Sequence, residues 1–362
     1  MDYLENRWLR ALATPPGLLF AGGVKLRNAL YRRGCLKAQR IGVPVVSVGN
    51  LNWGGSGKTP FAVYLAARFR DAGRRVAIAT RGYGGSRQDI PVTVSDGSGL
   101  LSDAAAAGDE AVLLASFLPS TVVVVCRDRI AAARFARDRY GSDLILLDDG
   151  FQHRRLHRDL DLVLISASHG LGNGRMIPFG PLREPAGELR RADAVVLTGT
   201  ASELSAKWPR LRDEMSQRRL SVPLFRCERR HDGFLRVFTE EPIPAAALKG
   251  MRTLAFSGIA RPGSFESDLR ALGLEVVSAL RFRDHQVYGP GQLDRIRAAA
   301  RSARADLLVT TEKDRVRLGS DLFPIPLYAL RMRLVAEDEE SLWSFVSGRL
   351  FDSAAPSLMS RA

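Results

Sequence analysis

Five residues in a short stretch have the types and spacing needed to bind phosphate groups: Gly54, Gly55, Gly57, Lys58 and Thr59. The backbone N–H groups of a glycine-rich turn can curl around phosphate oxygens. A lysine at this position can reach the β- and γ-phosphates of a nucleotide, and the threonine hydroxyl can bind Mg²⁺. We therefore predict a phosphate-binding loop, with Lys58 exposed when the loop is empty. The alternative is an ordinary flexible turn with an incidental lysine.

A pair of acidic residues, Asp148 and Asp149, ends the apolar run that begins at Leu144. A buried strand that ends in aspartate is the Walker-B arrangement, which holds Mg²⁺ opposite a phosphate-binding loop. The alternative is a solvated Asp-Asp-Gly turn.

Two further acids and one histidine stand at the ends of predicted helices or strands, where functional residues are often found. Asp109 and Glu110 begin a predicted helix, where the helix dipole alone favours carboxylates, so capping is the alternative. His285 follows a predicted strand and neighbours Asp284, which suits an acid–base or orienting residue as well as a structural histidine.

Two glycine-rich loops carry arginines. The first contains Arg81 and Tyr83, and the longer loop 173–185 contains Arg175 and Arg183. Glycines allow close backbone approach to a ligand, and arginine binds phosphate well. Flexible loops with surface ion pairs are the alternative. His153 and His157 lack metal-ligand spacing, so no zinc site is predicted.

The elements that must position these residues follow from hydrophobic patterning. Apolar or β-branched runs predict strands over 43–48, 75–80, 121–125, 143–148, 160–165 and 193–198. Helical spacing predicts helices over 59–71, 106–117 and 127–139. Strand–helix alternation predicts an α/β fold with a doubly wound, mostly parallel sheet, and such sheets bind ligands at the carboxyl ends of their strands. Asn52 stands where the usual phosphate-loop pattern opens with glycine, and asparagine tolerates left-handed backbone well.

A second, smaller α/β unit is predicted over 252–311 from strands at 252–256, 275–280 and 307–310 with helices between them. We accordingly expect four parts. They are an N-terminal segment 1–40, a P-loop domain 41–225, a smaller domain 226–345 and a frayed tail 346–362.

The composition favours an anionic partner. The chain has 362 residues, 46% of them hydrophobic, and a formal net charge of +14. Such a balance suits nucleic acid, anionic lipid or phosphorylated substrates. The three cysteines make no metal spacing and indicate a reducing compartment. No cleavable signal peptide and no uninterrupted apolar run of membrane-spanning length is evident.

The first forty residues combine apolar side chains with basic clusters. Pro15-Pro16-Gly17 is expected to divide this segment into two helices. Apolar bodies beside basic residues suit an anionic membrane surface, and two ordinary helices with a solvated basic face are the alternative.

Several motifs together resemble one protein family. In chain order they are Gly-Gly-Ser-Gly-Lys-Thr-Pro, Arg-Gly-Tyr-Gly-Gly, Gly-Asp-Glu, Asp-Asp-Gly-Phe-Gln-His, Pro-Phe-Gly-Pro-Leu-Arg-Glu-Pro, Phe-Arg-Asp-His and Thr-Glu-Lys-Asp. Over roughly residues 5 to 315 the chain resembles tetraacyldisaccharide 4′-kinase, the lipid A 4′-kinase of Gram-negative bacteria. The resemblance implies transfer of the ATP γ-phosphate to the 4′-hydroxyl of a lipid A disaccharide 1-phosphate. It also implies Mg²⁺, a peripheral location at the cytoplasmic face of the inner membrane, and two domains that close around nucleotide.

The resemblance also implies residue roles. Asp109 would be the catalytic base, paired with His285, and Lys58 would stabilise the transferring phosphoryl group. The nucleotide-binding residues would be Asn52, Gly54, Gly55, Ser56, Gly57, Lys58 and Thr59. The metal ligands would be drawn from Thr59, Glu110, Asp148 and Asp149. The candidate substrate-binding residues are Arg81, Tyr83, Arg175, Arg183 and Glu184.

Other classes of protein remain as alternatives at this stage. One is a different P-loop small-molecule kinase or a GTPase, although Thr311-Glu-Lys-Asp314 matches a guanine-binding Asn-Lys-x-Asp motif poorly at Glu312. Another is a basic nucleic-acid-binding ATPase, but no known nucleic-acid-binding module is present, and we expect no nucleic acid partner. No obligate protein partner is inferred.

Overall fold

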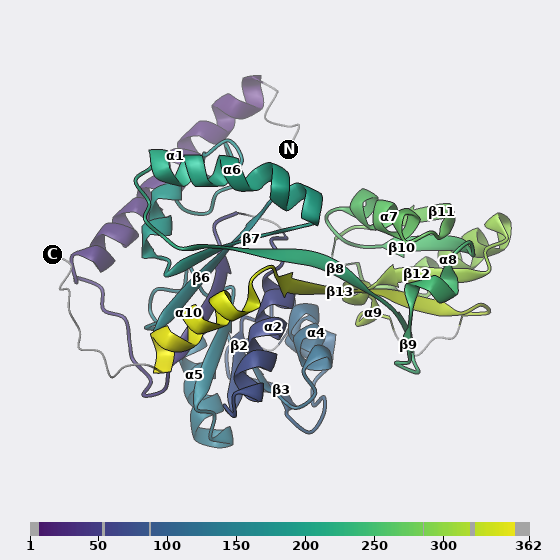
Figure 1. The fold of residues 1–362 in the computed structure, drawn as a ribbon, viewed down its shortest axis with the longest axis horizontal. Coiled ribbons are helices and arrows are strands. Elements are labelled where there is room, and N and C mark those ends of the chain that lie inside the picture. The colour runs from purple at the N-terminus through teal and green to yellow at the C-terminus, as the bar shows by residue number, and fades with distance from the viewer. Residues whose placement is uncertain (1–6, 53–54, 87, 285, 319–322, 352–362) are drawn as a thin grey trace.

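One continuous sheet organises the molecule (Figure 1). This computed structural model describes residues 7–52, 55–86, 88–284, 286–318 and 323–351. Within these residues the sheet has thirteen strands, twelve of which follow the order β11-β10-β12-β13-β8-β7-β6-β1-β5-β2-β4-β3, while β9 pairs with β8. The sheet belongs to an α/β fold, as the strand–helix alternation predicts.

The larger part of the sheet is parallel. Its strands are β1 (Val45–Asn50), β2 (Val76–Thr80), β4 (Val122–Val125), β5 (Leu144–Asp148), β6 (Leu160–Ser166) and β7 (Ala194–Gly199). These strands are almost wholly buried because helices cover both faces, which explains their continuous apolar sequences. All six were predicted to within about two residues. The antiparallel edge strand β3 (Val92–Asp96) was not, because it is only partly buried and its residues do not form a continuous apolar run.

Helices cover both faces of the sheet, so alternate residues of each strand belong to different hydrophobic cores. The helices α2 (Lys58–Asp71), α4 (Asp109–Phe117) and α10 (Glu339–Phe351) contribute to the core that contains Val46 and Ile78. The helix α5 (Arg129–Tyr140) packs on the opposite face with Val45 and Ala77. The helix α6 (Ala201–Gln217) covers that opposite face farther along the sheet, over β6 and β7. This division is the doubly wound arrangement.

The smaller part repeats the pattern with three parallel strands, β10 (Arg252–Ser257), β11 (Glu275–Arg281) and β12 (Leu307–Thr311). The helices α7 (Pro262–Ala271) and α8 (Pro290–Ala303) pack on opposite faces of these strands. Short elements complete the chain: α3 (Ala104–Ala107), η2 (Ala186–Arg191), β9 (Pro242–Ile243), η3 (Ala245–Leu248) and α9 (Glu312–Arg315).

Two long antiparallel strands join the larger and smaller parts. The strand β8 (Leu224–Arg236) and its partner β13 (Leu327–Ala336) run from one part to the other (Figure 1). The domain boundary expected between residues 225 and 226 therefore falls within β8. The larger and smaller parts are connected by hydrogen-bonded strands, whereas a domain boundary predicted from sequence would be expected in a loop.

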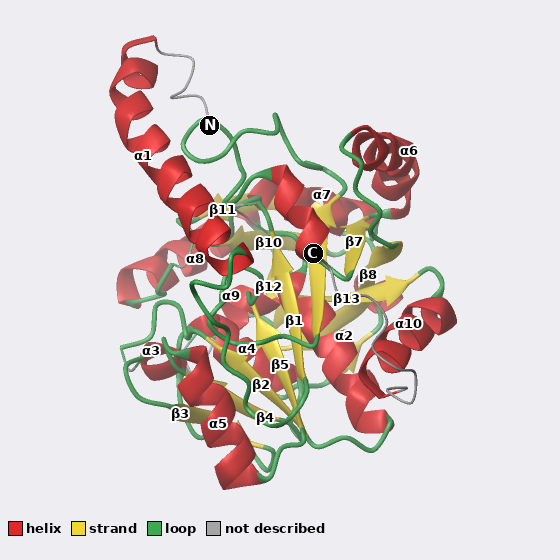
Figure 2. Ribbon diagram, turned by 90° about the vertical axis from the view of Figure 1, so that its left-hand side faces the viewer, coloured by secondary structure: helices red, strands yellow, loops and turns green. Residues whose placement is uncertain are grey.

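The N-terminal segment differs from the prediction of two helices. A single helix, α1 (Arg7–Arg32), passes through the Pro15-Pro16-Gly17 sequence and projects from the body of the protein (Figure 2). A proline removes one helical hydrogen bond, and the flanking turns can still continue the helix. Gly17 is buried against the loop 173–185, where an added Cβ would lie 2.6 Å from Cδ of Pro178. That contact fixes the helix just after the prolines.

The C-terminal helix also differs from the prediction, because α10 continues through residues expected to fray. Its aromatic residues pack on α2, where the Phe69 ring lies 5.3 Å from that of Trp343 and 6.3 Å from that of Phe351. Residues 352–362 lie outside the described part of the chain. None of the described helices is both long and apolar enough to cross a membrane.

Candidate functional site

The predicted phosphate-binding loop connects the end of β1 to the start of α2. Gly57 precedes the helix in a left-handed conformation (φ 80°), which favours glycine. Side-chain hydrogen bonds hold the loop from three directions. Asn50 Nδ2 donates to Ser56 Oγ (2.9 Å), Thr198 Oγ1 donates to Ser56 O (2.8 Å) and Asn52 Nδ2 donates to Gly170 O (2.7 Å). The first N–H groups of α2 lack carbonyl partners within the helix, as at any helix start, and are available to an anion. Gly54 lies outside the described residues.

Lys58 is not exposed, contrary to the expectation for an empty loop. Its side chain is 17% exposed because Nζ lies 3.4 Å from Oδ1 of Asp149. Arg183 reaches the same carboxylate, with Nη1 donating to both oxygens at 3.0 and 2.9 Å. Burial alone would raise the pKa of Asp149, but the charges of Lys58 and Arg183 outweigh burial and lower it. The structure thus brings together a predicted nucleotide ligand, a predicted metal ligand and a predicted substrate ligand.

Asp148 has the opposite electrostatic environment. Its side chain is buried, and Oδ1 has no hydrogen-bond partner among the described residues. Burial raises the pKa of Asp148 to about 7, and the negative charge of Glu110 adds to that shift. A buried carboxylate oxygen without a donor, close to a second acid, is suited to a cation.

Magnesium fits this donor set. Within the described ranges no three acidic, histidine or cysteine side chains gather closely enough to form a metal site by themselves. Mg²⁺ commonly takes one or two carboxylates and completes its octahedron with water and substrate phosphates. The carboxylates of Asp148 and Glu110, with the Thr59 hydroxyl at the start of α2, provide ligands of that kind.

The start of α4 is positioned by backbone packing between two glycine-containing loops. A Cβ built on Gly85 would lie 2.6 Å from Ala106 O and 2.8 Å from Gly108 N. A Cβ on Gly108 would lie 2.5 Å from Tyr83 O. Only glycine permits these approaches, so the Arg-Gly-Tyr-Gly-Gly loop and the Gly-Asp-Glu turn form one unit. Asp109 begins α4 from this unit and is buried.

The acids at the start of α4 contact a segment from the smaller part of the protein. Arg317 forms an ion pair with Oδ2 of Asp109. Lys313 Nζ lies 3.6 Å from Oε1 of Glu110 and 3.7 Å from Oδ1 of Asp284. His285 lies outside the described residues, but its neighbour Asp284 is linked through Lys313 to Glu110. The two motifs that contain the predicted dyad therefore approach one another.

The predicted substrate-binding residues occupy different environments. Arg81, Tyr83 and Arg175 are exposed on their loops. Arg183 contacts Asp149, as described above. Glu184 is buried, and the guanidinium groups of Arg27 and Arg191 pair with its two carboxylate oxygens.

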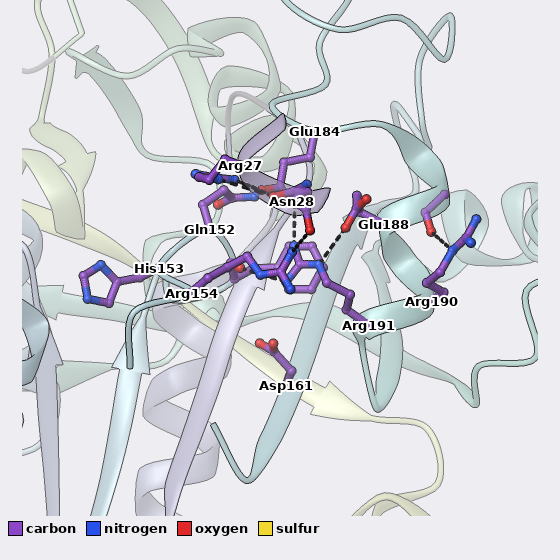
Figure 3. A network of polar contacts seen from close by, with 12 residues as sticks. Arg27, Asn28, Gln152, His153, Arg154, Asp161, Glu184, Glu188, Arg190 and Arg191 are labelled. Atoms are coloured by element: carbon purple, nitrogen blue, oxygen red, sulfur yellow. Dashed lines mark hydrogen bonds and ion pairs between the residues drawn. The ribbon is translucent and has the colours of Figure 1, made fainter. Parts of the chain in front are cut away.

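The Glu184 carboxylate belongs to a polar network that fastens α1 to the body (Figure 3). Arg32 Nη1 lies 2.8 Å from Oε1 of Glu188, whose other oxygen pairs with Arg191. Cζ of Arg154 lies 4.7 Å from the centre of the Tyr31 ring on α1. Burial lowers the pKa of this arginine to about 10. The second half of α1 is therefore part of the folded structure around the 173–191 region.

Sequence reasoning missed two arginines at the site. Arg129 is buried at the start of α5, after β4, and burial lowers its pKa, with a further contribution from the charge of Arg81. The helix dipole disfavours a buried cation at a helix N-terminus. An arginine at the start of a predicted helix is therefore a signal that sequence analysis could use. Arg317 follows Asp314 of the Thr-Glu-Lys-Asp motif by three residues, which was its only local signal.

Comparison with known proteins agrees with these motifs. A model of the tetraacyldisaccharide-1-P 4′-kinase family, LpxK, matches residues 9–350. The chain belongs to this family. A tetraacyldisaccharide 4′-kinase of Anaeromyxobacter dehalogenans (strain 2CP-C) is 44% identical, over 94% of this chain and 92% of that protein. One of Geobacter sulfurreducens is 42% identical, over 90% of each chain. The crystal structure of LpxK from Aquifex aeolicus in complex with ATP superposes with a TM-score of 0.76 at 33% identity, covering 95% of this chain and 100% of that one.

Substitution of the adjacent residues Asp148 and Asp149 by asparagine should change the stability of the fold in opposite directions. In protein free of Mg²⁺ and nucleotide, Asp148→Asn should stabilise the fold at about pH 8, because it removes a carboxylate whose folded-state pKa is raised. The gain should shrink as the pH falls from about 7 towards 4, since the buried carboxyl is then protonated anyway. Asp149→Asn should destabilise the fold at about pH 8, because a carboxylate with a lowered pKa stabilises the folded state above its unfolded pKa.

Urea denaturation of the two variants at several pH values measures both effects. Destabilisation by Asp148→Asn at about pH 8, or a gain that grows towards acid, would contradict the buried-carboxylate assignment.

Proposed function

We propose that this kinase transfers the γ-phosphate of ATP to the 4′-hydroxyl of a tetraacyl glucosamine disaccharide 1-phosphate, a precursor of lipid A. Its membership of the 4′-kinase family and its similarity to named relatives support this activity. The similar crystal structure holds ATP, which supports ATP as the phosphate donor. The comparisons give no support to a GTPase or a nucleic-acid-binding ATPase.

The observation that carries the proposal is the convergence of four motifs at one edge of the sheet. Lys58 contacts Asp149, Asp149 contacts Arg183, and the charge of Glu110 acts on Asp148. These residues lie in four places that are distant in sequence: the loop after β1, the end of β5, the loop 173–185 and the Gly-Asp-Glu turn. A donor phosphate on the loop and an acceptor near Asp109 would thus share one site.

The nucleotide-binding set in this proposal is Asn52, Gly54, Gly55, Ser56, Gly57, Lys58 and Thr59. Lys58 would leave Asp149 for the β- and γ-phosphates when nucleotide binds. Mg²⁺, held by ligands drawn from Thr59, Glu110, Asp148 and Asp149, would neutralise charge on the transferring phosphoryl group when bound.

Asp109 is proposed as the base that accepts the 4′-hydroxyl proton, with His285 as its orienting partner. A sugar hydroxyl is a poor nucleophile, and a positioned carboxylate can take its proton as the bond to phosphorus forms. Lys313 contacts both Glu110, which follows Asp109, and Asp284, which precedes His285. These contacts support a dyad formed by Asp109 of the larger part and His285 of the smaller part. Closure of these parts about β8 and β13 would exclude water and limit ATP hydrolysis.

Arg81, Tyr83, Arg175 and Arg183 are proposed to contact the phosphorylated disaccharide or the transferring phosphoryl group. Arg183 is proposed to exchange Asp149 for phosphate in the loaded site. Glu184 is proposed to act indirectly, because its buried carboxylate is held between Arg27 and Arg191. Through these contacts it would keep α1 beside the acceptor.

The substrate and α1 together support a peripheral location on an anionic membrane, and we propose the cytoplasmic face of the inner membrane, where ATP is available. The side chains of Leu18, Leu19 and Leu26 on α1 are 66%, 78% and 62% exposed. A cavity of about 680 Å³ between α1 and η2 has Lys25, Arg32 and Arg190 in its lining, together with Glu188 and apolar residues such as Leu26. Apolar side chains beside cations suit lipid acyl chains and phosphate headgroups.

A direct assay tests the activity. Purified protein, Mg·ATP and the disaccharide 1-phosphate in mixed micelles should yield a product with a second phosphate, detected by mass spectrometry. Lys58→Met should reduce turnover by at least about 10³-fold, because it removes the cation that stabilises the transferring group. Absence of a second phosphate with wild-type protein, or turnover by Lys58→Met near the wild-type rate, would contradict the proposal.

The dyad makes a separate prediction. Asp109→Asn and His285→Gln should each lower kcat by about 10²–10⁴-fold with little change in KM for ATP. Because residues that act as one unit are non-additive, the double variant should be little worse than the poorer single variant. Multiplicative losses in kcat would indicate that the two residues act independently. Loss of ATP binding by Asp109→Asn would indicate a role in the Mg·ATP complex.

The membrane proposal is tested with surface variants that leave the buried network of α1 intact. Replacing Leu18 and Leu19 by asparagine should weaken binding to anionic vesicles by about tenfold or more, because two exposed apolar side chains are lost. The matched control replaces Leu100 and Leu101, which are also exposed but lie next to α3, and should bind vesicles like wild type. Equal vesicle binding by all three proteins in a sedimentation assay would place the lipid contact elsewhere.

A further inference from the structure

Arg317 makes a contact between the larger and smaller parts of the protein that the proposed mechanism does not use. Its side chain is only 5% exposed, although arginine is rarely buried. The guanidinium group pairs with Oδ2 of Asp109, at the start of α4. Its Nη1 also donates to Gly258 O (3.1 Å) and to Oδ1 of Asp314 (3.2 Å). One side chain thus joins the β10 end, the α9 segment and the proposed base.

The position of Arg317 is determined by a buried carboxylate. Asp314 is fully buried and accepts hydrogen bonds from Gly258 N at 3.0 Å, Tyr288 Oη at 2.9 Å and Thr311 Oγ1 at 2.7 Å. A buried carboxylate needs hydrogen bonds and a compensating charge, and Arg317 supplies the charge. The Thr-Glu-Lys-Asp motif, through the Asp314 carboxylate, therefore holds the guanidinium group of Arg317 in a fixed position.

The contact also orients the Asp109 carboxylate. Arg317 engages Oδ2. Oδ1 lies on the side of the Arg-Gly-Tyr-Gly-Gly loop, since a Cβ built on Gly84 would be 3.9 Å from it. A carboxylate held through one oxygen has its rotation restricted, and a base must be held within tenths of an ångström of its productive geometry.

We propose that Arg317 is a positioning residue for Asp109, and that the Thr311–Asp314 motif exists to hold Arg317 against that carboxylate. The proposal rests on the proposed role of Asp109 as base. Lys313, two residues beyond Thr311, makes the parallel contact with Glu110, so the same short segment supports both acids of the Gly-Asp-Glu turn.

The decisive experiment is a double-mutant cycle on kcat. Arg317→Gln should lower kcat by about 10²-fold, the cost of misplacing a catalytic group by about an ångström, with KM for ATP little changed. In the Asp109→Asn background the same substitution should cause no further loss of kcat, because the group that Arg317 positions is already gone. Thermal stability should fall in both backgrounds, since Asp314 loses its cation in each.

A matched control and a rescue variant complete the design. Arg315 is the last residue of α9, two residues before Arg317, and it pairs with Glu240 instead of with the site, so Arg315→Gln should keep kcat within about twofold. Arg317→Lys retains the charge but loses the guanidinium fork, so its kcat should lie between those of Arg317→Gln and wild type. If Arg317→Gln fails to fold, the lysine variant decides. A folded Arg317→Lys whose loss of kcat disappears in the Asp109→Asn background supports the proposal, and wild-type kcat in folded Arg317→Lys, or an equal loss in both backgrounds, overturns it.

The outcomes separate this inference from the proposed function. If Asp109→Asn retains turnover, the proposed base is wrong and the positioning role is lost with it. If Asp109→Asn is inactive while Arg317→Gln keeps wild-type kcat, only the positioning role fails. An equal kcat loss from Arg317→Gln in both backgrounds also overturns the inference, because Arg317 would then act independently of Asp109.

Discussion

Several carboxylates gathered at the carboxyl edge of a parallel sheet need positive partners, and this requirement organises the site. Asp149 has Lys58 and Arg183, Asp109 has Arg317, and Glu110 has Lys313. Asp148 is the exception, with a raised pKa and a buried oxygen that lacks a hydrogen-bond donor among the described residues. Because most acids of the site are paired with cations, the charges of the empty site are nearly balanced. This balance suits a phosphoryl-transfer site that must accept both a cation and an anionic nucleotide.

The cations that balance these acids come from different parts of the fold. Lys58 and Arg183 come from the larger part, whereas Lys313 and Arg317 come from the smaller part. The two parts share β8 and β13, and a change in the twist of these paired strands would move the second pair of cations relative to the acids. Electrostatic pairing and the relative position of the two parts are therefore coupled, so the proposed closure would act directly on the proposed base.

The helix α1 combines two properties that are usually found separately. Its exposed leucines suit a lipid surface, while Arg27, Asn28 and Arg32 face a buried polar network with Glu184 and Glu188. Glu184 follows Arg183 directly, so the residue that holds α1 and the residue that contacts Asp149 are neighbours in the chain. A helix fixed in this way can present an acyl-chain surface at a set distance from the phosphate-binding loop, which a flexible anchor could not do.

The sequence alone determined the α/β class, the parallel core strands, the strand–loop–helix order around the glycine-rich loop 54–57, and the family. These features depend on local patterns: β-branched runs, glycine spacing, and acids that directly follow strands. Two predictions of where helices end were wrong. Proline was expected to divide α1, but tertiary contacts such as that of Gly17 hold the helix together, and residues expected to fray belong to α10, which packs on Phe69.

Only the tertiary structure decided how the motifs combine. The β8–β13 connection, the pairing of Lys58 with Asp149, the burial of Glu184 and the contact of Arg317 with Asp109 each join residues that are far apart in sequence. Such contacts leave no local periodicity. The β8–β13 connection is set by backbone hydrogen bonding, and the ion pairs are set by the need to neutralise charge once strands and helices have excluded water.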